Sequence, residues 1–189
     1  MLSERLSQAL AIAIEAHNGQ FRKETTIPYI AHPMAVASIA LEYGADEDQA
    51  MAALLHDAVE DGGAKYAKII RSKFGDRVAD IVDGCTDGIP DVNGEKTVLW
   101  KPRKESYLAH LRTASDDVLL VSGSDKLHNA RAIVSDLQNI GVKVFDRFSS
   151  SKEQTLWYYQ SLADIFKTRN TPTAKALSET VAQMHALSK

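Results

Sequence analysis

The sequence predicts an all-α protein, a bundle of about eight to nine helices. Apolar residues recur three and four positions apart in almost every segment, which is the period of an α-helix. Capping residues precede several of these segments and glycines follow them, so the starts and ends of helices can be read along the chain. Residues 118–121 alone would also fit a buried strand. Leu127, Ala130 and Val134 continue the same run at helical spacing and favour a helix.

The first three helices are separated by recognisable signals. An amphipathic helix near the N-terminus ends before a basic, proline-containing loop over residues 20–31. Pro33 suits the first turn of the second helix, where its missing N–H costs nothing. Asp46, with Gln49 three residues later, forms a capping-box pattern for the third helix. We expect that helix to run to Gly62-Gly63.

Six further helices are expected in the rest of the chain. Residues 84–101 concentrate glycine, proline and asparagine, which predicts a long loop, and long loops in compact domains are often functional. The apolar stripe of the eighth helix is interpreted as core. The expected helices lie over 66–74 and 78–85, from Pro102 through Leu111, from a cap at Asp116 or Asp117 to about Leu137, after a cap at Ser150 or Ser151, and over 173–187.

Composition narrows the class of protein. With 189 residues, 44% hydrophobic and 25% charged, the chain suits one soluble domain covering residues 1–189. A net charge of −3 argues against a dedicated nucleic-acid binder, which would need a basic excess. Cys85 is the single cysteine, so an internal disulfide and a multi-cysteine zinc site are excluded. No apolar run reaches the roughly 18 residues of a membrane span, and no signal peptide is recognisable, so a cytoplasmic protein is expected.

Three separated segments carry the residues with chemical potential: 29–33 with His32, 54–61 with the pattern HDxxED, and 124–131 with Asp125. On a continuous helix, the four ionisable residues of 56–61 would project over one broad side. Such groups at the end of an apolar helix are costly unless they bind a metal or face a wet cleft. Imidazole and carboxylate together suit a divalent transition metal. Taken singly, a solvated acidic helix end, a packed His32, or an Asp125 paired with Lys126 explains each segment as well.

The order of these segments is more specific than any one of them. PYIAHP at 28–33, ALLHDAVED at 53–61, FGDRVADIVDGCTD at 74–87 and SDKLHNAR at 124–131 follow one another, preceded by Arg22-Lys23. With these motifs the chain resembles the HD-domain phosphohydrolases. It is most similar to the hydrolase domain of RelA/SpoT-type proteins, especially the small single-domain alarmone hydrolases.

The resemblance implies an HD-type helical bundle and a set of roles. One ion, typically Mn²⁺, would be held by His32, His56, Asp57 and Asp125, and these ligand types also suit Fe²⁺ or Zn²⁺. The acidic pair Glu60 and Asp61 would serve the attacking water. Arg22 and Lys23 would lie at the nucleotide base, and Asn129 and Arg131 would line the nucleotide pocket.

The implied reaction removes the 3′-pyrophosphate of (p)ppGpp, which yields GDP or GTP and pyrophosphate. The chain would be a hydrolase only, because it is too short to include the family's synthetase domain. Two alternatives remain open. One is an HD-domain phosphatase acting on another nucleotide, such as the 2′-phosphate of NADPH. The other is a non-catalytic nucleotide-binding domain of the same fold, against which the intact Glu60-Asp61 pair argues.

Basic and aromatic residues give further candidates for substrate contact. Lys126 and Arg131 are the strongest candidates for phosphate, since they lie close in sequence to Asp125. Positive charge near the sixth predicted helix either binds phosphate or belongs to a solvated helix face. It comes from Lys101, Arg103, Lys104 and Arg112. Tyr29 and Tyr43 either stack on a base or pack. Gly123, within a predicted helix, either loosens that helix or lets a ligand approach the backbone.

Overall fold

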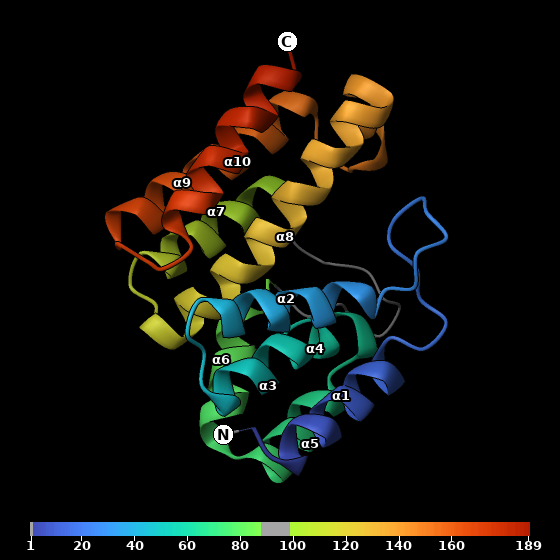
Figure 1. Ribbon diagram of the computed structural model, residues 1–189, viewed down its shortest axis with the longest axis vertical. Coiled ribbons are helices and arrows are strands. Elements are labelled where there is room, and N and C mark those ends of the chain that lie inside the picture. Colours follow the sequence, from blue (N-terminus) through green and yellow to red (C-terminus); the bar gives the residue numbers. More distant parts are fainter. Residues whose placement is uncertain (1, 88–98) are drawn as a thin grey trace.

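The computed structural model describes residues 2–87 and 99–189, and within these ranges the chain forms a bundle of helices with no β-strand (Figure 1). The all-α prediction is therefore confirmed for this part of the chain. The helices are α1 (Glu4–Ala16), α2 (Ala31–Glu42), α3 (Glu47–Leu55), α4 (Ala58–Gly62), α5 (Lys65–Phe74), α6 (Asp76–Cys85), α7 (Trp100–Leu111), α8 (Asp116–Ile140), α9 (Lys152–Thr168) and α10 (Ala174–Leu187), with a 3₁₀ helix, η1 (Gly141–Arg147), between α8 and α9.

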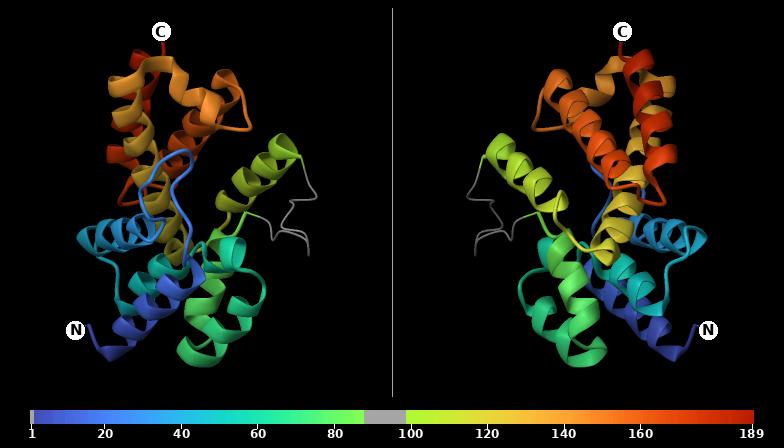
Figure 2. Two further views of the ribbon diagram at one scale, coloured as in Figure 1. Left: turned by 90° about the vertical axis from the view of Figure 1, so that its right-hand side faces the viewer. Right: turned by 90° about the vertical axis from the view of Figure 1, so that its left-hand side faces the viewer.

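Helix α8 organises the bundle. Its 25 residues correspond to a length of about 37 Å. It contacts α2, α3 and α6 along one part, and α9, α10 and η1 along the other. The lower group in Figure 1, α1 to α6, and the upper group around α9 and α10 thus share one long helix, and Figure 2 shows α7 leaning away from α10 on one side. No helix in the described ranges is both long and apolar enough to cross a membrane.

The third predicted helix is broken, and this expectation was wrong. Helix α3 ends at Leu55 and α4 begins at Ala58, so ten helices are described where nine segments were predicted. The His56 ring nitrogen Nδ1 lies 2.8 Å from the carbonyl oxygen of Ala53. In a continuous helix that carbonyl would accept from the amide of residue 57. Where the helix stops, the side chain of His56 donates to the Ala53 carbonyl in place of that backbone amide. The expectation that residues 56–61 project over one side of a continuous helix therefore does not apply.

Most of the other local signals are confirmed. Asp46 and Gln49 form a reciprocal capping box, and Pro33 lies in the first turn of α2. Ser151 caps α9 with a second capping box through Gln154. For α8 the cap is Ser115, whose hydroxyl accepts from the Val118 amide at 3.3 Å, rather than Asp116 or Asp117.

The predicted loop 84–101 is shorter at both ends. Gly84 and Cys85 belong to α6, and α7 begins at Trp100 instead of Pro102. Residues 88–98 of the predicted loop lie outside the described ranges.

Gly123 serves the packing of α8. A Cβ atom at this position would lie 2.3 Å from Thr173 Oγ1 and 3.2 Å from Phe166 Cε1. The segment before α10 and helix α9 therefore approach the α8 backbone where the side chain is missing. Neither interpretation made from the sequence, a loosened helix or an approaching ligand, is needed to explain this glycine.

Candidate functional site

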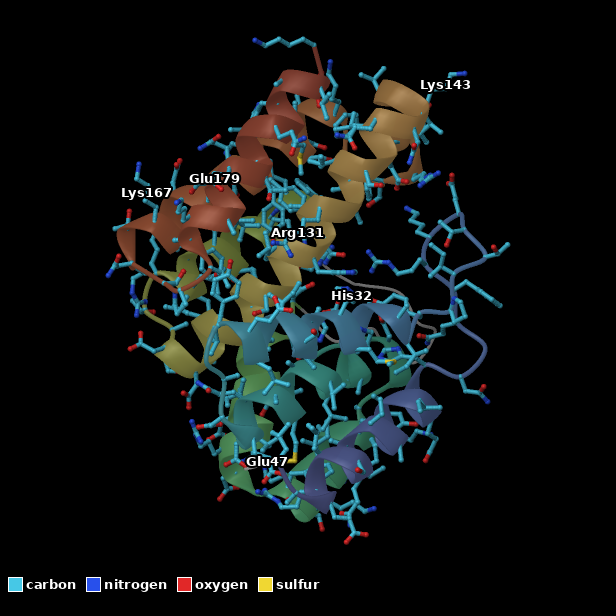
Figure 3. The ribbon with its side chains drawn as sticks, in the orientation of Figure 1. His32, Glu47, Arg131, Lys143, Lys167 and Glu179 are labelled. Atoms are coloured by element: carbon cyan, nitrogen blue, oxygen red, sulfur yellow. The ribbon has the colours of Figure 1, made fainter. Side chains whose placement is uncertain are left out.

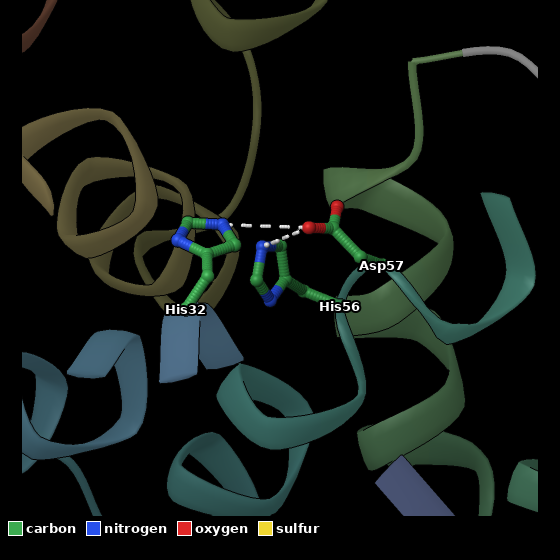
Figure 4. Close-up of side chains that lie close together, drawn as sticks. All are labelled: His32, His56 and Asp57. Carbon is green, nitrogen blue, oxygen red and sulfur yellow. Dashed lines mark ion pairs between the residues drawn. The ribbon is translucent and has the colours of Figure 1, made fainter. Parts of the chain in front are cut away.

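The four residues expected to bind a metal converge from three places in the fold. His32 lies in the first turn of α2, His56 and Asp57 form the break between α3 and α4, and Asp125 lies within α8. Figure 4 shows the two imidazole rings directed at Asp57. His32 Nε2 is 3.4 Å from Asp57 Oδ2 and 3.2 Å from Asp125 Oδ1, and the corresponding distances from His56 Nε2 are 3.1 and 3.7 Å.

His56 is held in the form that a metal ligand requires. With Nδ1–H donating to the Ala53 carbonyl, Nε2 is the ring nitrogen that faces the two carboxylates, and it offers a lone pair to a metal once its proton is lost. That Nε2 atom is buried and has no hydrogen-bond partner in the described structure. A buried, unpartnered nitrogen is costly unless something binds it. Together with a second imidazole and two carboxylate oxygens, it fits a divalent cation.

The charges in this cluster balance one another. Burial disfavours the imidazolium form of His56 and would lower its pKa. The Asp57 and Asp125 carboxylates have the larger combined effect and raise the pKa of His56 well above its ordinary value. Burial likewise opposes the ionised carboxylates. The imidazoles hold the pKa of Asp57 well below its usual range, and Lys126, followed by the imidazoles, does so for Asp125. The two carboxylates therefore favour a positive charge at this point, which a proton on His56 or a bound cation can supply.

His32 has an outer partner that the sequence did not single out. Its Nδ1 lies 2.8 Å from Nδ1 of His128, and the two rings are 4.9 Å apart. Burial and the neighbouring His32 lower the pKa of His128 to about 4. A neutral His128 can accept the Nδ1–H of His32, which leaves Nε2 of His32 directed at the carboxylates. His128 belongs to the SDKLHNAR motif, so its place near Asp125 was foreseeable from helical spacing, but its contact with His32 was not.

Asp125 is held by two neighbours on α8. Asn129 Nδ2 donates to Asp125 Oδ1 at 2.6 Å, and Lys126 Nζ lies 2.5 Å from Asp125 Oδ2. The Lys126 side chain is 13% exposed and its ammonium group lies 5.2 Å from the Tyr107 ring centroid. The structure thus places Lys126 as a counter-charge to Asp125. Its predicted contact with substrate stays a prediction.

A cleft of about 500 Å³ opens beside this cluster. Arg22, Lys23, Tyr29 and Asn129 line it, as do Arg147, Phe148 and Tyr159, which the sequence did not indicate. Arg22 Nη2 donates to Asn129 Oδ1 at 2.7 Å, so a chain of hydrogen bonds runs from the cleft through Asn129 to Asp125. None of the four cluster residues lines the cleft, and Asn129 connects the cleft wall to Asp125.

Arg131 does not join this group. It lies on α8 (Figure 3) and is exposed. It is not among the residues that line the cleft, although Asn129, two positions earlier, is. Two positions along a helix turn the side chain to a different side. Nothing in the described geometry supports its predicted place in the nucleotide pocket.

Glu60 and Asp61 lie on α4, directly after the break that carries His56 and Asp57. Glu60 is half-buried and its Oε2 accepts from the Asp87 amide at 3.1 Å. Asp87 in turn binds Arg103 and Lys104, with Arg103 Nη1 2.6 Å from its carboxylate. Asp61 is exposed, and its backbone carbonyl accepts from the Gln20 side-chain Nε2 at 3.2 Å.

The other basic residues lie elsewhere. Lys101 lies 3.9 Å from Glu105 on the surface of α7. Arg112 lines a separate cleft beside α9.

Comparison with known proteins agrees with this geometry. Residues 9–152 match the family model described as HD domain. The chain belongs to the HD-domain family. Among curated relatives, it is 37% identical over 130 residues to a guanosine-3′,5′-bis(diphosphate) 3′-pyrophosphohydrolase of Haemophilus influenzae, and 36% identical over 138 residues to the bifunctional (p)ppGpp synthase/hydrolase SpoT of Escherichia coli. These matches cover 66% and 70% of this chain but 18% of each relative.

Two solved structures are similar over most of the chain. One is a metazoan ortholog of SpoT, described as hydrolysing ppGpp and playing a role in starvation responses. It superposes with a TM-score of 0.78 at 25% identity, and the match covers 97% of both chains. The other is a protein of Listeria monocytogenes, with a TM-score of 0.72 at 29% identity, covering 82% of this chain and 99% of that one. The HD-type fold predicted from the motifs is therefore confirmed.

Proposed function

We propose that this chain is a metal-dependent hydrolase that removes the 3′-pyrophosphate of (p)ppGpp, and that residues 1–189 act as one HD-type domain around α8. The observation that carries the proposal is the convergence of two imidazole nitrogens and two carboxylate oxygens beside a cleft lined by Arg22 and Asn129. The similar proteins named for (p)ppGpp hydrolysis support this choice of substrate.

In this proposal His32, His56, Asp57 and Asp125 hold one divalent ion, for which we propose Mn²⁺. Bound there, the ion would draw charge from phosphate oxygens and lower the pKa of a water. Glu60 or Asp61 would accept the proton of the attacking water, since both follow the ligand-bearing break directly and are carboxylates.

The cleft supplies the nucleotide contacts. Arg22 is planar, permanently charged and lines the cleft, so it can stack on a base or attract phosphate. Lys23 adds a second positive charge at the same wall. Asn129 stands between the cleft and Asp125. Lys126, beside the other oxygen of Asp125, would meet a phosphate that reaches the ion.

The experiment is a substrate panel with Mn²⁺ in which pyrophosphate and inorganic phosphate are measured separately. Release of pyrophosphate from ppGpp, with GDP as the other product, is the expected result. Phosphate release from NADPH without action on ppGpp would replace this function with the 2′-phosphatase alternative. Binding of ppGpp without turnover at any metal concentration would favour the non-catalytic alternative. Asp57→Asn serves as the inactive control.

A further inference from the structure

Tyr29 is fixed between the cleft and the metal cluster. Its amide donates to the Gln20 carbonyl at 2.9 Å, and its own carbonyl accepts from the His32 amide at 2.8 Å. Its ring lies 4.8 Å from the His17 ring and 5.7 Å edge-on from the His32 ring. Backbone and ring are thus both held, so the direction of the hydroxyl group is set by the fold.

That hydroxyl meets the oxygen atom that faces both imidazoles. Tyr29 donates to Asp57 Oδ2 at 2.8 Å. The same Oδ2 lies 3.1 Å from His56 Nε2 and 3.4 Å from His32 Nε2. A phenol is a donor at neutral pH, whereas an ionised carboxylate only accepts. The hydrogen bond therefore occupies one lone pair of Oδ2 and leaves another toward the point between the two rings.

Asp57 needs such a partner because of where it stands. It lies in the break between α3 and α4, and its side chain makes no capping hydrogen bond to the start of α4. Asp125, by contrast, is held from its own helix by Lys126 and Asn129. Apart from the two imidazoles, the described contact that holds the Asp57 side chain is the hydrogen bond from Tyr29, which lies 28 positions earlier in the chain.

We propose that Tyr29 is a positioning residue whose hydroxyl orients Asp57 for metal binding, rather than a stacking platform for the nucleotide base. The assignment rests on the metal site of the proposed function. Its ring already packs against His17 and His32, and Arg22 lies over it with the guanidinium carbon 5.7 Å from the ring centroid. The hydroxyl group is the part of Tyr29 that reaches the metal cluster.

The test compares Tyr29→Phe with Tyr66→Phe. Tyr66 also donates its hydroxyl to a carboxylate, Glu15 Oε1 at 3.2 Å, so it is a control for removing a tyrosine hydroxyl away from the metal cluster. Tyr66 is buried, whereas Tyr29 is half-buried. Binding of Mn²⁺ to the metal-free protein is measured by the loss of the free-ion electron paramagnetic resonance signal. Tyr29→Phe should weaken Mn²⁺ binding by about 10- to 100-fold, the usual cost of losing an outer partner of a ligand. Tyr66→Phe should bind Mn²⁺ as the wild type does.

A second measurement separates positioning from base stacking and from loss of fold. Turnover by Tyr29→Phe should recover when Mn²⁺ is raised, with an unchanged KM for nucleotide and an unchanged thermal midpoint of the metal-free protein. Wild-type Mn²⁺ affinity in Tyr29→Phe would overturn the assignment while leaving the proposed function intact. A raised nucleotide KM at saturating Mn²⁺ would assign Tyr29 to the base. Failure of the wild type to bind any divalent ion would remove the metal site itself.

Discussion

Replacing Asp125 by alanine should have two separable effects, loss of metal binding and loss of stability. Asp125 is 5% exposed and faces both imidazole Nε2 atoms through Oδ1. Its other oxygen lies 2.5 Å from the ammonium group of Lys126. Asp125→Ala therefore removes a proposed metal ligand and also leaves the largely buried Lys126 without its carboxylate.

The expected size of the second effect follows from the burial of Lys126. Removing one partner of a buried ion pair costs about 3–5 kcal/mol, because the remaining charge is left uncompensated. Contact with the Tyr107 ring offsets some of this, so the lower end, about 3 kcal/mol, is expected. Adding Lys126→Met removes the stranded charge at similar volume. The double variant should regain most of the lost unfolding free energy but still bind no metal.

Urea unfolding of the metal-free proteins and Mn²⁺ binding by equilibrium dialysis measure the two effects independently. Asp125→Ala with wild-type stability would show that Lys126 finds another counter-charge and that the pairing argument is wrong. Wild-type Mn²⁺ affinity in the double variant would show that Asp125 is not a ligand. Lys126→Met alone, which keeps Asp125 between its two imidazoles, is the control for the lysine substitution.

Three further outcomes are expected. Glu60→Gln should lower kcat while leaving bound Mn²⁺ unchanged by elemental analysis, because the loss falls on the transition state; metal loss in step with kcat would make Glu60 a ligand. The rise in thermal midpoint caused by Mn²⁺ should grow as the pH is raised above 6.5, the ordinary pKa of histidine. The raised pKa of His56 stabilises the metal-free protein in acid, this contribution is lost as the pH rises through that pKa, and the ion competes with the same proton. A pH-independent rise would contradict this. Gly123→Ala should destabilise the fold by about 1–3 kcal/mol through overpacking against Thr173, and Gly123→Ala/Thr173→Ala should recover part of it; an unchanged midpoint in the single variant would refute the packing role.

Local signals predicted most of the helices because capping and periodicity act over a few residues. The capping box at Asp46 and Gln49 and the proline in the first turn of α2 were both recognisable and both correct. The break after Leu55 was not, since every residue from Ala50 to Val59 is compatible with a helix. The acceptor taken by the His56 side chain depends on the direction of its ring, and the surrounding packing sets that direction.

The helical bundle and the residues of the candidate site were predictable from the order of the amino acids alone. Two histidines and two aspartates in a specific order indicated a metal cluster before their geometry was visible. The tertiary structure decided what each of them touches. Tyr29 reaches Asp57 across 28 positions, His128 meets His32 across 96, and Arg22 meets Asn129 across 107, while Arg131 stays outside the cleft. Such contacts depend on how the segment before α2, helix α2 itself, the break between α3 and α4, and helix α8 pack together. The spacing of residues within any one helix carries no information about that packing.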